Sequence, residues 1–402
     1  MTAAARALSR GDVIGALKRV ALRNDAPALA LRGIAMAQLG DFERAKTLLQ
    51  RATKAFTPKE ALARARCSVA LAEIALASRD LGWPGKALEA SRAVLEAHHD
   101  LLNSAHARLL EIRRLVLMGE LDKAERLLGR LDPSPFPPVS RAAYELAAAG
   151  IAIRRVHAAA AEAALARAKK AAQVAGIGAL AAEIDAAALG LKAPAAQLVS
   201  PDSDRLLDLA EVEKLLASDA LIVDACRYSV RHRDTVIPLA SRPVLFALAR
   251  ALAEAWPNDV PRSALVARVF RGKQADESYR ARLRVEMGRL RKAMRPVAGI
   301  DATEDGFVLA TRRPKDVVVL APPVEGDNAA LLALLSDGES WSSSALGLAL
   351  GASQRTVQRG LDALAEAGKV QSFGRGPARR WTAPPLPGIT TTLLLPVSLP
   401  GG

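Results

Sequence analysis

The sequence predicts a mainly α-helical protein, in which an N-terminal α-helical repeat array precedes two small α+β domains. Aromatic residues make up only 3% of the 402 residues, and the many alanines and leucines favour helices. A glycine followed five residues later by an alanine recurs along the N-terminal half, which indicates repeated pairs of helices. After residue 220, short segments rich in β-branched residues alternate with amphipathic helices, which indicates two smaller mixed domains.

The repeat array is expected to span residues 1–195. Its glycines should end the first helix of each pair, and its alanines should let the second helix approach closely. The pairs are Gly11/Ala16, Gly40/Ala45, Gly82/Ala87 and Gly119/Ala124. The clearest unit is Leu31–Ala52, and Leu109–Leu128 repeats its pattern. The array resembles tetratricopeptide repeats, and a generic helical bundle is the alternative.

Proline-rich segments divide this half of the chain. Pro133–Pro138 predicts a loop, a last helical pair is expected over about Ser140–Leu191, and Lys192–Asp204 reads as a linker. The net charge of +14 is uneven, because residues 1–195 hold 29 Lys and Arg against 19 Asp and Glu. The basic array could therefore attract DNA at long range or hold an acidic partner.

The first mixed domain is expected over residues 205–315. The predicted elements are a helix at Arg205–Leu216, strands at Leu221–Val223, Cys226–Val230 and Val236–Leu239, and helices at Arg242–Ala255 and Pro261–Phe270. A basic amphipathic helix then runs from Ser278 to Met294, and a hairpin follows at Ile300–Leu309.

The basic helix carries the main functional signal of this domain. Leu283, Met287, Leu290 and Met294 recur at steps of four, three and four, which makes one apolar stripe that should pack inward. The cationic side chains of the other faces suit the major groove, where arginine reads phosphates and guanine edges. The candidate DNA-binding residues are Arg280, Arg282, Arg284, Arg289, Arg291 and Lys292.

The segment Leu221–Thr311 resembles the OmpR-type winged-helix domain of response regulators. Gly288–Met294 is similar to the end of that family's recognition helix, and Gly306-Phe307 matches a Gly-Tyr pair in its wing. The resemblance implies that Arg289 and Arg291 contact phosphates or bases and that Leu290 is core. The wing here contains Glu304 and Asp305, which DNA should repel, so we do not expect it to enter a minor groove. The alternative is a domain that only packs or dimerises.

A second mixed domain is expected over residues 327–385. Helices are predicted at Asn328–Leu335 and Ser342–Leu350, and a third runs from its N-cap Ser353 to Ala367, with Gly368 as its C′ residue. Strands at Lys369–Phe373 and Ala378–Thr382 should form a basic hairpin.

The third of these helices is amphipathic. Val357, Leu361 and Leu364 should face inward, and polar side chains should project from its first turns, where helix-turn-helix proteins contact bases. The candidate DNA-binding residues are Ser353, Gln354, Arg355, Gln358 and Arg359 in the helix and Arg375, Arg379 and Arg380 in the hairpin. The segment resembles the winged helix-turn-helix of DeoR- and MarR-like regulators, and a merely solvated helix face is the alternative.

Other chemistries find little support in the sequence. It holds no phosphate-binding loop, and we expect no enzyme activity, no metal and no cofactor. His98, His99, Asp100 and His106 are interpreted as a surface cluster. Cys67 and Cys226 should be reduced core thiols. The proline-rich apolar tail, residues 386–402, is expected either to dock on another surface or to be disordered.

These patterns together predict a bacterial transcription regulator that binds double-stranded DNA in a sequence-specific manner. The repeat array would sense a signal or dock a protein or peptide partner, and a homodimer remains open. The alternative is a scaffold with tetratricopeptide-like repeats, whose winged helices contact proteins or dimerise. No apolar run reaches the roughly 20 residues needed to cross a bilayer, and no secretory leader opens the chain. We therefore expect a cytoplasmic, nucleoid-associated protein with no membrane partner.

Overall fold

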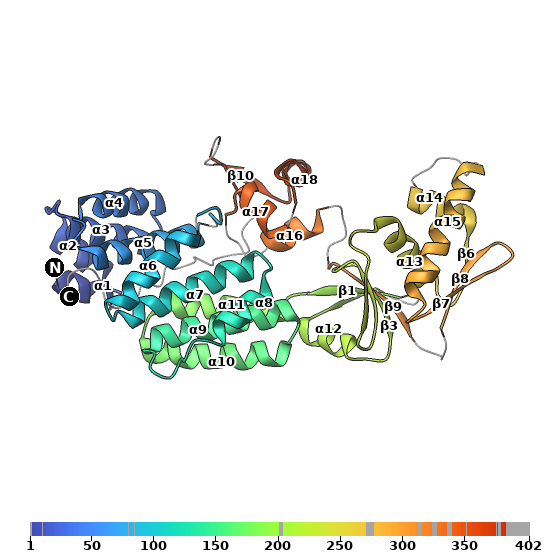
Figure 1. Cartoon of the computed structure of the whole chain (residues 1–402), viewed down its shortest axis with the longest axis horizontal. Helices are drawn as coiled ribbons and strands as arrows, with labels where there is room; N and C mark the ends of the chain where they lie inside the picture. The colour runs from blue at the N-terminus through green and yellow to red at the C-terminus, as the bar shows by residue number, and fades with distance from the viewer. Residues whose placement is uncertain are drawn as a thin grey trace. The chain divides into compact units, whose positions relative to one another are not determined.

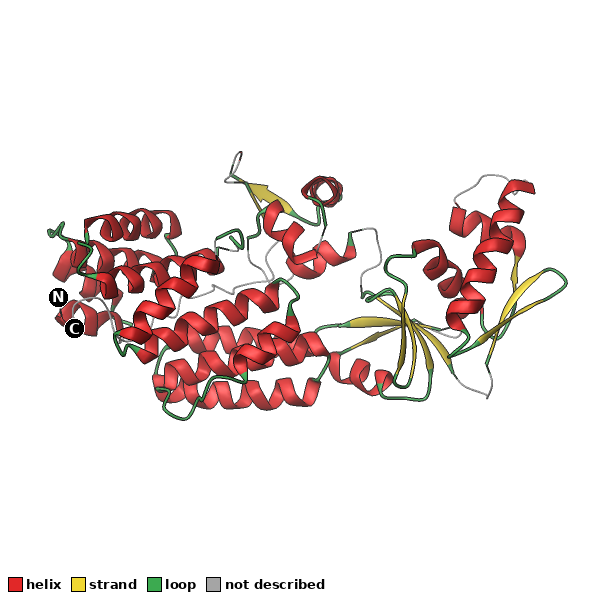
Figure 2. Ribbon diagram, viewed as in Figure 1, coloured by secondary structure: helices red, strands yellow, loops and turns green. Residues whose placement is uncertain are grey.

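A computed structural model of the chain describes residues 2–9, 11–78, 80–83, 85–200, 204–270, 277–311, 316–323, 328–335, 340–350, 352–374, 376 and 379–382. The fold is mainly helical, at 64%, with eighteen helices among these residues and a small mixed sheet toward the C-terminus (Figures 1 and 2). The predicted mainly α class is confirmed at this level. Of the helices in the described ranges, none is long and apolar enough to cross a membrane.

The chain divides into two compact units. One unit combines residues 1–190 with residues 327–402, and the other comprises residues 191–326. The first unit therefore joins two segments that lie far apart in the sequence.

Successive helices pack against one another along the N-terminal part of the first unit (Figure 1). Aspartate side chains start several of them: Asp12, Asp25, Asp41 and Asp100 each accept a hydrogen bond from a backbone amide of the following turn. The helices are α1 Thr2–Ser9, α2 Val13–Val20, α3 Ala26–Gln38, α4 Phe42–Ala55, α5 Ala61–Ala77, α6 Gly85–Ala97, α7 Leu101–Leu117, α8 Leu121–Leu128, α9 Pro138–Arg155, α10 Ala158–Ala175 and α11 Gly178–Lys192.

Three of the four predicted glycine–alanine pairs behave as expected. The glycines at positions 11, 40 and 119 have positive φ angles after α1, α3 and α7, and the alanines at 16, 45 and 124 are buried. The pair Gly82/Ala87 is wrong, because Ala87 is exposed and Leu88 and Ser91 face the interior from α6. Gly82 lies in the long connection after α5, so it does not end that helix.

The end of the array also differs from the prediction. The proline-rich loop lies where expected, between α8 and α9, but three helices follow it rather than one pair. Val156 and Gly176 adopt left-handed backbone conformations at the ends of α9 and α10 and so create two turns.

The second unit is built on a six-stranded mixed sheet. Its strand order is β2-β1-β9-β3-β4-β5, in which only the β3–β9 pair is parallel. The strands are β1 Ala196–Val199, β2 Arg205–Leu207, β3 Leu221–Asp224, β4 Ser229–His232, β5 Thr235–Pro238 and β9 Val317–Ala321.

Three local predictions in this region are wrong. The expected linker contains β1, and the helix expected from Arg205 begins only at Leu209, as α12 Leu209–Leu216. Asp208 starts that helix by a reciprocal capping box with Glu211, which leaves the preceding residues free to form β2. The strand expected from Cys226 starts at Ser229 instead, because the Asp224 carboxylate accepts bonds from two backbone amides and holds a tight turn.

Helices and a small sheet complete the second unit. They are α13 Pro243–Ala255, β6 Val260–Pro261, α14 Arg262–Phe270, α15 Glu277–Met294, β7 Gly299–Ala302 and β8 Gly306–Ala310, with the three strands ordered β6-β8-β7. One buried cluster contains Leu248, Leu265 and Met287 from the helices together with Val223 and Val319 from the large sheet. The same cluster includes Ile300 and Phe307 of the small sheet, so the two sheets and three helices share a core.

The C-terminal segment of the first unit forms a set of three helices and a hairpin. Its elements are α16 Ala329–Leu335, α17 Ser343–Leu350, α18 Gln354–Glu366, β10 Gln371–Phe373 and β11 Arg380–Thr382. Trp341 pairs with Trp381 across the sheet, and both indoles are buried. Their cluster continues into Leu76 of α5 and Leu88 of α6. The tail, residues 386–402, lies outside the described residues.

Candidate nucleic-acid interface

The inner face of α15 is apolar over its whole length. Leu283, Met287, Leu290 and Met294 are each at most 2% exposed, as the sequence periodicity predicts. They pack among residues of α13, α14 and the β7–β8 hairpin. This burial fixes the rotation of α15 and directs its remaining faces to solvent.

Every candidate cationic residue on α15 is exposed, and the contacts of Arg282, Arg289 and Arg291 show how the unit holds some of these side chains. The Arg282 guanidinium lies 4.8 Å from the centre of the Phe270 ring. Arg289 donates to the Glu286 carboxylate at 2.7 Å. Glu286 therefore offsets part of the positive charge of the helix.

Arg291 makes two contacts with the β7–β8 hairpin. Its Nε donates to the carbonyl oxygen of Ile300 at 2.8 Å, and its guanidinium lies 5.4 Å from the Phe307 ring centre. It therefore joins α15 to the hairpin, and it must lose these contacts or share them in order to bind a phosphate. The structure does not distinguish Arg291 as a base-reading residue.

The hairpin turn after β7 is held rigidly by α14. Arg262 donates to the carbonyl oxygens of Glu304 and Thr303 at 2.7 and 3.0 Å, and it also stacks at 5.3 Å on Phe307. Gly306 donates to the Thr303 hydroxyl at 2.9 Å. The turn thus presents the exposed Glu304 and Asp305 on a fixed support. Whether this acidic tip stays out of a minor groove remains a prediction from the charge of these two residues.

Helix α18 has the same division into an inner and an outer face. Val357, Leu361 and Leu364 are at most 5% exposed, so these inward positions are confirmed. Ser353 accepts a hydrogen bond from the Thr356 amide at 3.2 Å, and Gly368 follows the helix with a φ of 68°. Both predicted helix ends are therefore confirmed.

The polar residues of α18 differ in their contacts. Gln354 donates to the Ser343 hydroxyl at 3.3 Å, and Gln358 donates to Asp362 at 2.9 Å. Arg355 and Arg359 are exposed, and their guanidinium groups have no hydrogen bond or ion pair within the described ranges. These two arginines are therefore available to bind an external anion.

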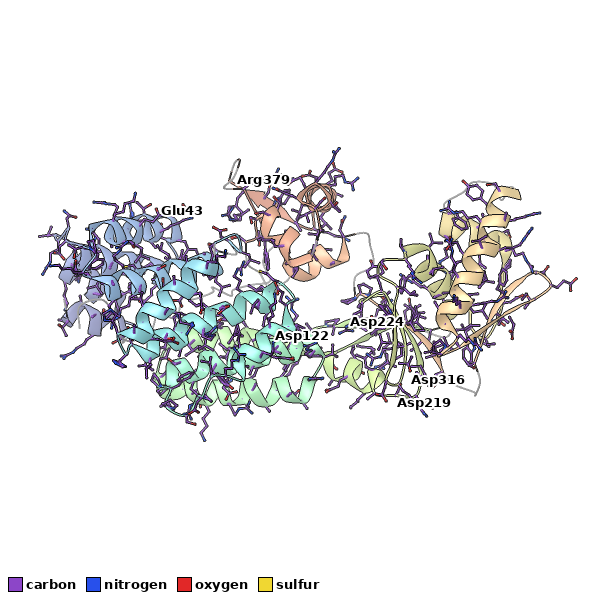
Figure 3. All side chains as sticks on the ribbon, in the orientation of Figure 1. Glu43, Asp122, Asp219, Asp224, Asp316 and Arg379 are labelled. Atoms are coloured by element: carbon purple, nitrogen blue, oxygen red, sulfur yellow. The ribbon has the colours of Figure 1, made fainter. Side chains whose placement is uncertain are left out.

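The hairpin beside α18 holds its arginines in two ways. Arg379, labelled in Figure 3, stacks at 4.2 Å on the Trp381 ring centre and donates to the Ser372 hydroxyl at 3.2 Å. Arg380 instead lines a small pocket with Glu43 and Lys46 of α4. The structure therefore does not group Arg380 with the arginines of α18, and Arg375 lies outside the described residues.

The interpretation of the histidine region as a surface cluster needs correction. His106 is buried, and its Nε2 lies 3.1 Å from the buried Glu73 carboxylate. Asp100 accepts a bond from Arg66 at 2.7 Å. Within the described ranges, no group of three or more His, Cys, Asp or Glu residues could hold a metal ion.

The cysteines are also not equivalent. Both thiols are free, but Cys226 is exposed and only Cys67 is buried. The expectation of two core thiols is therefore wrong for Cys226. Burial raises the pKa of the Cys67 thiol to about 12.

The sequence missed the residue that secures the first hairpin. Arg262 follows a proline at the start of a short helix, and no pattern there predicts that it contacts a turn about 40 residues later. Tertiary folding alone brings these two segments together. Comparison of the chain with protein-family models, curated proteins and solved structures finds no match.

Proposed function

We propose that this protein is a sequence-specific regulator that binds double-stranded DNA through two winged helices. The observation that carries the proposal is an order of elements that occurs twice. A helix, a short strand, two helices and a two-stranded hairpin follow one another in α13–β8 and again in α16–β11, where Trp341 supplies the short strand. In both sets, the third helix is buried on one side and cationic on the other.

The two proposed winged helices divide the work. The first, with its large sheet, corresponds to the OmpR-type domain, in which α15 would enter the major groove. The second corresponds to the winged helix-turn-helix of DeoR- and MarR-like regulators, in which α18 would read bases. The guanidinium groups of Arg355 and Arg359, which bond to no other group in the described part of the chain, support base or phosphate contacts by α18. Arg379 is already oriented by Trp381 and suits a phosphate contact.

The N-terminal helices would serve as a docking array with tetratricopeptide-like pairs. The positive φ angles after α1, α3 and α7 and the buried alanines of the following helices support this assignment. The excess of basic residues in this half suits an acidic protein or peptide. The array would then connect a signal to the regulator, while α15 and α18 determine which DNA sequence is bound.

A selection experiment tests the proposal. The full-length protein would be incubated with a random duplex pool, and the enriched sequence would be compared with that of Arg355→Ala/Arg359→Ala. We expect a shared motif for the wild type and the loss of part of it in the double variant, at about 1–3 kcal/mol for each lost base contact. The matched control Arg126→Ala/Arg130→Ala removes the same charge from exposed positions of the array and should keep the motif. If the wild type enriches no sequence, the result would favour the alternative function, a protein-interaction scaffold.

A further inference from the structure

The outermost line of α15 is not its most basic part. At about 100° per residue, Ala281, Val285, Gly288 and Lys292 fall on one line opposite the buried stripe. All four are exposed, and Val285 is 54% exposed. An apolar side chain therefore lies at the centre of the face that the proposed function turns toward DNA.

Cationic residues border this line on both sides. Arg280 and Arg284 lie on one side of it, and Arg282 and Arg289 lie on the other, all exposed. The major groove is about 12 Å wide, and its walls are lines of phosphates on both sides of an inserted helix. Two cationic borders with an apolar centre match that cross-section, because only the centre of the helix faces the base edges.

Gly288 adds an independent observation. It lies inside an 18-residue helix, and a Cβ added there would meet nothing within 4 Å. Glycine weakens a helix interior relative to alanine, and no packing among the described residues requires it here. Its missing side chain leaves room one turn from Val285, where another molecule can approach the backbone closely.

We propose that Val285 contacts the C5-methyl group of a thymine in the major groove, with Gly288 allowing α15 to come close enough. This inference rests on the proposed function and goes beyond it by naming the base pair that α15 reads. Valine has no hydrogen-bonding group, so it cannot read donors or acceptors. The thymine methyl is the apolar group that the major-groove edge of a base pair offers, and aliphatic side chains contact it.

The test replaces single thymines by deoxyuridine, which removes the methyl group and keeps the base pair. Full-length protein would be titrated by fluorescence anisotropy against its selected duplex and against each single replacement. We expect one thymine at which replacement weakens wild-type binding by about fourfold, the effect of one methyl-sized apolar contact. Val285→Ala should bind the unmodified duplex about fourfold more weakly and should lose its sensitivity at that thymine alone.

Two further variants make the test specific. Val236 of β5 is 50% exposed, which is similar to Val285. Val236→Ala should therefore keep both the affinity for the duplex and the sensitivity to loss of the thymine methyl. Gly288→Leu should weaken DNA binding more than tenfold while its melting temperature stays at or above that of the wild type, because leucine favours a helix.

The outcomes separate the two proposals. If the protein binds duplex DNA but Val285→Ala keeps the wild-type sensitivity at every thymine, the inference is overturned and the proposed function stands. Unchanged DNA binding by Gly288→Leu also overturns it, since the face would then be free for a protein partner. If the wild type binds no duplex at all, the proposed function itself fails.

Discussion

Replacing Gly306 by alanine should loosen the first hairpin selectively. A Cβ at this position would lie 1.9 Å from the carbonyl oxygen of Val260 and 2.6 Å from its carbonyl carbon. Both are backbone atoms of β6, which pairs with β8 at this point, so no side-chain rotation relieves the overlap. The strand must move by more than an ångström, which separates β6 from β8 and disturbs the bonds that Arg262 makes to the turn.

Overpacking of this kind costs about 1–3 kcal/mol, and the backbone overlap places Gly306→Ala at the upper end of that range. Hydrogen exchange followed by mass spectrometry would measure it in peptides that cover β7 and β8. A local loss of about 2–3 kcal/mol should speed amide exchange in those strands roughly 30- to 150-fold.

Gly299→Ala is the matched control on the same hairpin. A Cβ there would lie 3.5 Å from the Ala310 Cβ, an ordinary contact, so exchange should change by less than about threefold. If Gly306→Ala exchanges like the wild type, the close approach of β6 to the hairpin is wrong. If both variants loosen equally, the effect is not specific to that contact.

Three other predictions concern separate parts of the molecule. Arg379→Ala should weaken binding to all duplexes about equally, whereas Arg355→Ala should change which sequences are preferred. Selected-sequence profiles and affinities measure both effects. An equal loss of affinity for every duplex in Arg355→Ala would argue against base reading. Leu290→Ala should lower the free energy of unfolding by about 2–5 kcal/mol, since this side chain is 0% exposed, and a urea melt with a smaller change would place α15 outside the core. The folded-state pKa of Cys67 lies above its ordinary value, so its contribution to stability is complete below about pH 9 and is lost as pH rises toward about 12. Iodoacetamide at pH 8 should therefore label Cys67 only after unfolding, and rapid labelling in the native state would contradict its burial.

Periodicity and local capping made several parts of the fold predictable. The steps of four, three and four in α15 depend on helix geometry alone, and the four predicted residues are all buried. The ends of α18 were predictable for the same reason, because Ser353 and Gly368 end the helix through interactions within its first and last turns. Signals that act over a few residues are thus readable from the sequence.

Pairings between distant segments were not predictable. β1 lies in a segment rich in small and proline residues, and it becomes a strand because it pairs with β9, more than 100 residues later. The two strands that flank β9 in the sheet, β1 and β3, also come from different parts of the chain. No local preference in any of these segments identifies its partner.

The candidate site shows the same limit for side chains. The sequence placed Arg289 and Arg291 together as candidate contacts, but their partners, Glu286 and Ile300, give them different surroundings. Arg380 likewise lines a pocket with α4, whose residues precede it by more than 300 positions. The sequence can propose which residues are cationic and exposed, whereas their intramolecular partners follow from tertiary packing.

The most direct test of the central claim is the salt dependence of duplex binding by the full-length protein. If α15, α18 and the β10–β11 hairpin displace counterions from about six phosphates, the logarithm of the binding constant should fall with the logarithm of salt at a slope near −5. Affinity would then drop about a thousandfold between roughly 50 and 200 mM salt. A slope near zero, or no binding to a genomic fragment pool at about 50 mM salt, would contradict DNA binding and leave a protein-interaction scaffold in its place.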